Sequence, residues 1–180
     1  MTAPLSQYAR RRKLQYFFSH IDRSARILEI GCADGWVGRY AIANGWTDFV
    51  GIDIVPPPTP PGHEFVLGDI NQWKSLGLEA ESFDAVIAFE VVEHGDFFDA
   101  VHALLRPGGK LLVTTPVPHM DWLCKLMERA GLNQRRTSPH SHLTYLRDFP
   151  KSFRPVETSV KAGISQWGVF ERTRVLVSGR

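Results

Sequence analysis

Short apolar runs alternate with stretches of helical spacing along most of this chain. The runs are rich in Val, Ile, Leu and Phe, which is typical of buried parallel strands. They lie at residues 27–30, 49–53, 64–70, 83–89 and 105–113. Between them, and before the first, apolar residues recur every three or four positions, as on one face of a helix. The helical stretches are residues 5–20, 36–45 and 97–105. Strands that alternate with helices predict a doubly wound α/β fold.

The helix after the first strand and the end of the chain give more specific predictions. In that helix we expect Val37, Tyr40, Ala41 and Asn44 to be buried and Gly45 to end it. Residues 121–130 have the spacing of another helix. The final strands are expected at residues 156–160 and 167–178, where apolar and polar residues alternate.

Residues 55–62 break the alternation between the second and third strands. The run Val-Pro-Pro-Pro-Thr-Pro-Pro-Gly contains five prolines, each of which removes a backbone donor and fixes φ. A helix cannot form across such a run, and extended polyproline backbone is favoured instead. We therefore expect a rigid Pro-rich segment in place of the second crossover helix.

A glycine turn follows the first strand, at residues 31–35. Gly31 and Gly35 can bend the backbone sharply and let a ligand approach without a Cβ in the way. Cys32, between them, is expected to present its backbone N–H beside a small side chain. Asp53 ends the second strand about 20 positions later, the spacing at which a carboxylate meets ribose hydroxyls in nucleotide-binding folds. This arrangement predicts a site for a nucleotide-type cofactor.

The run Glu29-x-Gly31-x-Ala33-x-Gly35 resembles motif I of the class I S-adenosylmethionine-dependent methyltransferases, with Ala33 in place of the middle glycine. The fingerprint of NAD-dependent dehydrogenases fits less well, because Trp36 stands where its third glycine belongs. The resemblance therefore implies S-adenosyl-L-methionine as the cofactor and disfavours NAD.

Later segments resemble the same family in the same order. Residues 68–70, Gly-Asp-Ile, resemble its adenine-binding segment. Residues 90–94, Glu-Val-Val-Glu-His, are similar to motif IV of the branch that contains the ubiquinone-pathway O-methyltransferases. Residues 105–109, Leu-Arg-Pro-Gly-Gly, resemble its turn into the fifth strand, and residues 139–145 resemble a histidine-containing segment of the branch.

The resemblance implies a Rossmann-like methyltransferase fold in one domain, residues 1–180, with a seven-stranded, mostly parallel sheet and an antiparallel closing strand. An N-terminal helix or cap is expected at residues 1–24, and the cofactor-binding core at residues 26–116. An acceptor-side lid at residues 117–150 and a closing hairpin at residues 151–180 complete the expected domain.

The resemblance also implies which residues hold the cofactor. The Asp53 carboxylate would bind the ribose, Asp69 would accept from the exocyclic amine of adenine, and Ile70 would cover the ring. The expected cofactor-binding residues are Glu29, Gly31, Cys32, Ala33, Gly35, Asp53, Ile54, Asp69, Ile70, Phe89 and Glu90.

Methyl transfer from a sulfonium is an in-line displacement, so positioning supplies much of the catalysis. An oxygen acceptor must still lose its proton, which calls for a base near the ends of the fourth and fifth strands. The expected catalytic residues are Glu90, His119 and His142, with His94 and His140 as further candidates. Imidazole suits this task because its pKa lies near neutrality. We therefore expect methylation of an oxygen on a small molecule.

Glu90, Glu93 and His94, joined by His140 or His142, offer an alternative, a site for magnesium or manganese. The small-RNA 3′-terminal 2′-O-methyltransferases have a similar set, so a metal-assisted RNA-terminal enzyme is one alternative function. We assign no residue to a metal, because an acid-rich helix start also explains Glu93 and His94. A non-catalytic cofactor-binding or partner-binding module is the other alternative, motivated by the proline run.

Composition narrows the expected partners. The formal net charge of +2 is too small to demand a nucleic acid, and the basic residues 10–13 read as a solvated helix face. No apolar run approaches the roughly 20 residues of a membrane span. Cys32 and Cys124 are too few for a disulfide framework, which favours a reducing compartment. We expect a cytoplasmic protein that acts on a small-molecule methyl acceptor, without nucleic acid or membrane as partner.

Overall fold

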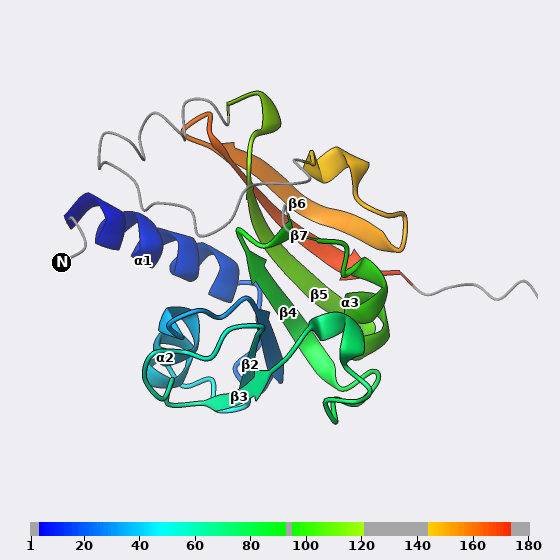
Figure 1. Cartoon of the computed structure of the whole chain (residues 1–180). Helices are drawn as coiled ribbons and strands as arrows, with labels where there is room; N and C mark the ends of the chain where they lie inside the picture. Colours follow the sequence, from blue (N-terminus) through cyan, green and yellow to red (C-terminus); the bar gives the residue numbers. More distant parts are fainter. Residues whose placement is uncertain (1–3, 93–94, 121–143, 174–180) are drawn as a thin grey trace, which may run out of the picture.

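A seven-stranded sheet forms the centre of the computed structural model, which describes residues 4–92, 95–120 and 144–173 (Figure 1). The strands lie in the order β3-β2-β1-β4-β5-β7-β6. Their bounds are β1 (Ile27–Ile30), β2 (Phe49–Asp53), β3 (Glu64–Leu67), β4 (Phe83–Phe89), β5 (Leu105–Pro116), β6 (Phe153–Lys161) and β7 (Ser165–Arg172). β7 pairs antiparallel with β5 and β6, and the other pairs are parallel. The mostly parallel sheet with an antiparallel closing strand is confirmed.

Helices cover both faces of this sheet, which confirms the doubly wound arrangement. α1 (Pro4–Phe18) and α2 (Trp36–Ala43) lie on one face, and α3 (Phe98–Leu104) lies on the other (Figure 1). Single 3-10 turns are η1 (Ile70–Gln72), η3 (Pro118–Met120) and η4 (Leu146–Asp148). None of the helices in the described ranges is long and apolar enough to span a membrane.

Alternate residues of each central strand pack toward opposite helices. On β1, Ile27 packs on the side of α1 with Phe17, whereas Leu28 packs on the side of α3 with Val101. All of these side chains are fully buried. Because both faces of the strand are covered, apolar side chains lie on both of them. The next residue, Glu29, therefore points to the α1 and α2 side.

The ends of α2 follow ordinary capping chemistry, with one correction to the expected burial. Val37 and Ala41 are buried and Tyr40 is half-buried. The prediction that Asn44 is buried was wrong. Its side chain is exposed and its amide donates to the Tyr40 carbonyl at 2.8 Å, because the last carbonyls of a helix lack intrahelical partners. Gly45, with a φ of 94°, ends the helix as expected.

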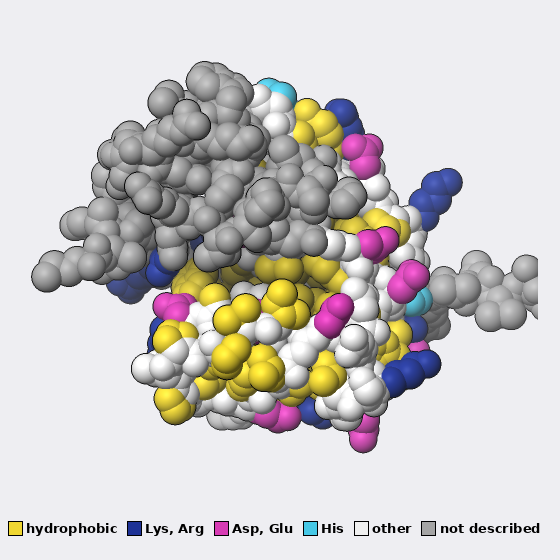
Figure 2. All heavy atoms as spheres, viewed as in Figure 1, with side chains coloured by type: hydrophobic (Ala, Val, Ile, Leu, Met, Phe, Trp, Pro, Cys, Tyr) yellow, Lys and Arg dark blue, Asp and Glu magenta, His cyan; other side chains and the backbone are white. Residues whose placement is uncertain are grey.

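The connector of residues 54–63 joins β2 to β3 without a helix, as the prolines predicted. Its first residues are open to solvent, with Ile54 at 73% and Val55 at 61% exposed. Figure 2 shows apolar side chains gathered on this part of the surface, over α2, β2 and β3. The end of the connector turns inward, because Pro61 is buried against the glycine turn.

The strands of the C-terminal half are longer at some ends than expected. The fifth strand was expected at residues 105–113, but β5 continues to Pro116. Thr115 and Pro116 pair with Gln166 and Ser165 of β7, so a strand from far along the chain extends the ladder. The closing hairpin of β6 and β7 is confirmed, with β7 ending at Arg172.

Several predicted features lie outside the described residues. These are the helix at residues 121–130, the last positions of the final strand at residues 174–178, and the side chains of Glu93, His94, His140 and His142. Their expected roles stay predictions.

Candidate functional site

The glycine turn lies between β1 and α2, at the carboxyl edge of the sheet, where open α/β sheets bind ligands. Gly31, Ala33 and Gly35 have φ values of 71°, 47° and 74°, the left-handed region that glycine adopts readily. A Cβ on Gly31 would lie 2.6 Å from a methyl group of Val91, and one on Gly35 would lie 2.7 Å from Cβ of Pro61. Space as well as backbone conformation therefore requires glycine at both ends of the turn.

Hydrogen bonds fasten the turn to β2. The Gly31 N–H donates to the Ile52 carbonyl at 2.8 Å, and the Ala33 N–H donates to Oδ2 of Asp53 at 2.8 Å. Oδ1 of Asp53 accepts from the Val55 N–H at 3.0 Å. Each carboxylate oxygen has a second acceptor position. Asp53 can therefore hold the turn and still accept from the hydroxyls of a ribose.

Cys32 does not present its backbone N–H, and that prediction was wrong. The N–H donates to the Ile52 carbonyl at 3.4 Å, and the side chain is 1% exposed. Its Sγ packs against Gly51 of β2. A Cβ on Gly51 would lie only 2.9 Å from this sulfur. Burial, assisted by neighbouring carboxyl groups, raises the pKa of the thiol to about 12. Cys32 is a neutral packing group beneath the turn.

Glu29 is also buried beneath the turn, with 2% of the residue exposed. Its Oε2 has no hydrogen-bond partner among the described residues. Burial, then the carboxyl groups of Asp34 and Asp53, raises the pKa of Glu29 well above its ordinary value, and Arg39 opposes the shift. Burial thus favours the protonated carboxyl, which can donate as well as accept. A polar group of a ligand could form the hydrogen bond that this buried oxygen lacks, so the turn suits a bound cofactor.

The expected adenine end lies beside the end of β2. The Gly68 N–H donates to the Asp53 carbonyl at 2.9 Å, which brings the residues after β3 next to this carboxylate. Asp69 is exposed and caps η1 with its side chain. Ile54 is exposed as well, whereas Ile70 is 6% exposed and packs in the core on the α3 side. Ile70 therefore offers little surface to a ligand.

Glu90 stands at the end of β4, where β5 and α1 hold it. Its φ is 56°, and its N–H donates to the Thr114 carbonyl at 2.8 Å. Oε1 of Glu90 accepts from Oγ1 of Thr114 at 2.8 Å and lies 3.3 Å from Nζ of Lys13. Nζ of Lys13 lies 5.4 Å from the ring centroid of the half-buried Phe89. This arrangement fixes an exposed carboxylate at the edge that carries the glycine turn.

The partners of Glu90 were not identified from the sequence. Lys13 lies 77 residues and Thr114 lies 24 residues from Glu90. Lys13 belongs to a basic run that looks like a solvated helix face, and Thr114 is a polar position inside a strand. The helical spacing of apolar residues, which predicts that the N-terminal helix packs against the sheet, was the one sequence signal that could have pointed to Lys13.

His119 lies in η3, just beyond the end of β5. Its Nδ1 is 3.0 Å from Oη of Tyr145, and the two rings stack with centroids 6.3 Å apart. The amide of Gln166 donates to the Pro116 and Thr144 carbonyls at 3.1 Å, which holds the Tyr145 segment in place. His119 is thus a second candidate base that follows a neighbouring strand.

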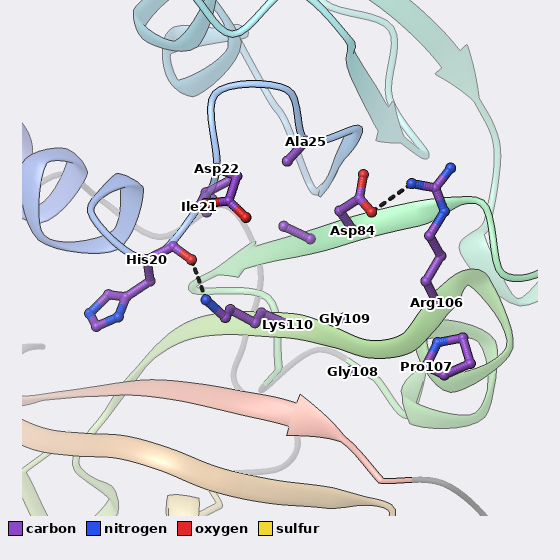
Figure 3. Close-up of a pocket in the computed structure, with 11 residues that line it drawn as sticks. His20, Ile21, Asp22, Ala25, Asp84, Arg106, Pro107, Gly108, Gly109 and Lys110 are labelled. Carbon is purple, nitrogen blue, oxygen red and sulfur yellow. Dashed lines mark hydrogen bonds and ion pairs between the residues drawn. The ribbon is translucent and has the colours of Figure 1, made fainter.

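A pocket of about 210 Å³ lies at the opposite, amino edge of the sheet (Figure 3). Both of its cations have protein partners: Nζ of Lys110 donates to the His20 carbonyl at 2.7 Å, and Arg106 pairs with Asp84 at 2.6 Å. The turn of residues 105–109 contributes to this pocket. That turn is therefore a structural element of the amino edge and lies away from the glycine turn.

The described residues contain no group of three or more His, Cys, Asp and Glu side chains placed to hold a metal ion. Glu90 is engaged with Lys13 and Thr114. The other members of the alternative metal set, Glu93, His94, His140 and His142, lie outside the described ranges.

Sequence comparison matches residues 5–152 to a family described as a methyltransferase domain. The mitochondrial ubiquinone biosynthesis O-methyltransferase of Mus musculus is 35% identical over 104 residues, which cover 50% of this chain and 28% of that protein. The chain thus spans less than half the length of the curated relatives it matches.

Two solved structures have the same fold. One is the 1,6-didemethyltoxoflavin-N1-methyltransferase of Burkholderia thailandensis with bound S-adenosylhomocysteine, at 19% identity and a TM-score of 0.61, covering 91% of this chain and 78% of that chain. The other is the N-methyltransferase NodS of Bradyrhizobium japonicum WM9, also at 19% identity and a TM-score of 0.61, covering 95% of this chain and 98% of that chain. At this identity the likeness concerns the fold alone.

Proposed function

The chain belongs to the methyltransferase domain family and uses S-adenosylmethionine, and from that premise we propose that it methylates an oxygen of a small molecule. The observation that carries this proposal is the exposed Glu90 carboxylate, which Thr114 and Lys13 hold at the end of β4. A hydroxyl acceptor needs a base at such a place. The mouse relative is named an O-methyltransferase, which agrees with an oxygen acceptor.

The glycine turn would hold the methionine end of the cofactor. Gly31 leaves room for close approach, and Oε2 of Glu29 needs a polar partner beneath the turn. Asp53 would accept from the ribose hydroxyls, with Ile54 and Asp69 beside the adenine. When bound, S-adenosylmethionine supplies an electrophilic methyl group on its sulfur.

Glu90 would remove the proton of the acceptor hydroxyl. Within the described part of the chain its side-chain contacts are made by Oε1, so Oε2 is the atom that would receive the proton. Thr114 and Lys13 keep the carboxylate in one position, which is the positioning that an in-line transfer requires. The Glu90 side chain is 42% exposed, so the proton can pass to solvent afterwards.

A hollow of about 360 Å³ lies against β6, β7 and η4, on the side of His119. Tyr145, Ser159 and Gln166 are among its lining residues, and Tyr145 is the partner of His119. Its volume is in the range of small-molecule sites, roughly 300–1,000 Å³. His119 would be the second candidate base on this side.

The basic run on α1 gives little support to an RNA acceptor. Arg10 lies 5.0 Å from the ring centroid of Trp36, and Lys13 forms the ion pair described above. Arg11 and Arg12 are the exposed members of the run. Tight binding to a nucleic acid usually neutralises more phosphates than two cations can reach.

Transfer of a labelled methyl group from S-adenosylmethionine to a panel of phenols and catechols tests the proposal. The same compounds without the hydroxyl are the control, and we expect label only in the hydroxylated set. If the label instead enters the 3′ ends of short RNAs, and EDTA abolishes this transfer, the RNA-terminal alternative would be favoured. Binding of S-adenosylhomocysteine without transfer to any acceptor would favour the non-catalytic module.

A further inference from the structure

The proline connector ends in His63, whose imidazole fills a slot lined by glycine. A Cβ on Gly38 of α2 would overlap with Cε1 and Nδ1 of the ring, and would lie 2.9 Å from Nε2. A Cβ on Gly51 of β2 would also lie 2.9 Å from Nε2. Neither position has a left-handed backbone, so steric space is the reason for glycine at both. The ring is wedged between the helix and the strand that hold the glycine turn.

The same ring also reaches the turn. A Cβ on Gly35 would lie 3.1 Å from Cε1 of His63. Sγ of Cys32 and Nε2 of His63 both lie close to Gly51, each 2.9 Å from where its Cβ would be. Phe49 of β2 meets the ring edge-on, with centroids 5.0 Å apart. His63 thus packs beneath the turn, on the face of the sheet that carries α2.

This slot suits a neutral imidazole. Both ring nitrogens of His63 are buried, and neither has a hydrogen-bond partner among the described residues. Burial lowers the pKa of His63, the Arg39 guanidinium lowers it further, and the Pro61 carbonyl partly opposes the change. Arg39 is itself paired with Asp34 at 3.7 Å. The titratable or charged groups on the elements around the ring are Arg39, Tyr40, Asp34, Glu29, Cys32, Asp53 and Glu64.

We propose that His63 is a positioning residue, a neutral wedge that holds the glycine turn in its cofactor-binding shape and releases it when protonated. The proposal rests on the placement of the cofactor at that turn. It does not depend on which atom accepts the methyl group. None of the described residues forms an ion pair with His63, so a charged ring would move toward solvent and leave α2 and β2 without their spacer.

Calorimetric titration with S-adenosylhomocysteine between about pH 8 and about pH 5.5 tests the proposal. We expect the wild-type affinity to fall as the pH drops below the ordinary histidine pKa of 6.5. The variant His63→Leu, apolar and of similar volume, should bind at pH 8 within about threefold of wild type and keep that affinity at acid pH. Equal pH slopes for the two proteins, or no binding at any pH, would overturn the proposal.

A size swap tests the wedge without any change of pH. Gly38→Ala should weaken binding at least about tenfold, because its methyl group needs the space of the ring. Adding His63→Ala to Gly38→Ala should restore much of the affinity and the melting temperature. Gly95→Ala, where a Cβ meets no atom of the described residues within 4 Å, is the control and should bind like wild type. A double variant as weak as Gly38→Ala alone would contradict the wedge. Neither titration uses an acceptor, so a failure of oxygen methylation would leave both results interpretable.

Discussion

The two halves of the candidate site are held in different ways. The cofactor half, residues 31–35, is fixed by its own backbone: left-handed glycines and N–H groups that donate to the Ile52 carbonyl and the Asp53 carboxylate. The acceptor half is fixed by side chains, with Glu90 held by Lys13 of α1 and Thr114 of β5. The first half therefore depends on consecutive strands, β1 and β2, and the turn that follows β1, whereas the second requires three elements that are distant along the chain to meet.

This difference decides which measured quantity each substitution should change. A buried hydrogen bond whose loss leaves a group unpaired costs about 1–3 kcal/mol, whereas an exposed ion pair contributes at most about 1 kcal/mol. Changes in the glycine turn should appear in stability and cofactor affinity. Changes at Glu90 and its partners should appear in turnover.

The largest effect is expected for Glu90→Gln in the acceptor half. Gln can still accept from Thr114 but is a very weak base, so kcat should fall by about 10²–10⁴-fold while the affinity for S-adenosylhomocysteine stays near wild type. Steady-state kinetics and calorimetry measure the two quantities. Glu64→Gln, an exposed carboxylate on β3, is the control. An unchanged kcat would remove Glu90 from the role of base.

Gly31→Ala probes the cofactor half through its backbone. The new Cβ would be strained at a φ of 71° and would lie 2.6 Å from Val91, so the free energy of unfolding should drop by about 2–4 kcal/mol. Urea denaturation measures this loss. In Gly108→Ala the φ is 80°, but the new Cβ would meet no atom within 4 Å in the described part of the chain, so backbone strain of about 1–2 kcal/mol is the expected loss. If both variants lost the same free energy of unfolding, the close contact with Val91 would add nothing to the backbone strain.

Asp53→Ala should weaken binding of S-adenosylhomocysteine by about 1–3 kcal/mol, because the Ala33 N–H and the ribose hydroxyls lose an acceptor. Isothermal titration calorimetry measures the change directly. Asp48→Ala, which removes a surface carboxylate paired with Arg26 at 3.6 Å, is the control. Unaltered affinity would take Asp53 out of the site.

Lys13→Met should have the smallest effect. The pair with Glu90 is partly exposed, with side-chain exposures of 18% and 42%, so we expect kcat to fall by roughly fivefold or less. Lys13→Arg should recover most of the rate, and the exposed Arg12→Met should leave it unchanged. If Lys13→Met costs as much as Glu90→Gln, Lys13 does more than position the carboxylate.

The glycine turn is the part of the site that could be predicted best. The turn at Gly31 and Gly35 and the strand end at Asp53 could be predicted because local geometry requires glycine and a carboxylate at a fixed spacing, and their binding of the cofactor stays a prediction. Cys32 was misjudged, since which way an N–H points depends on the strand next to it. Ile70 is a similar case, because its burial depends on the core on the α3 side.

The order of strands and helices along the chain and the absence of a helix across the connector could be predicted from the sequence alone. They follow from hydrophobic period and from the backbone limits of proline and glycine, which act over a few residues. The family was indicated by the resemblance of its motifs. Three contacts became visible in the folded protein: Lys13 meets Glu90, β7 pairs with β5 as far as Pro116, and His63 fills a slot beside Gly38 and Gly51. Such contacts join residues that are distant along the chain, so they exist only once the layers of the sheet and helices have packed.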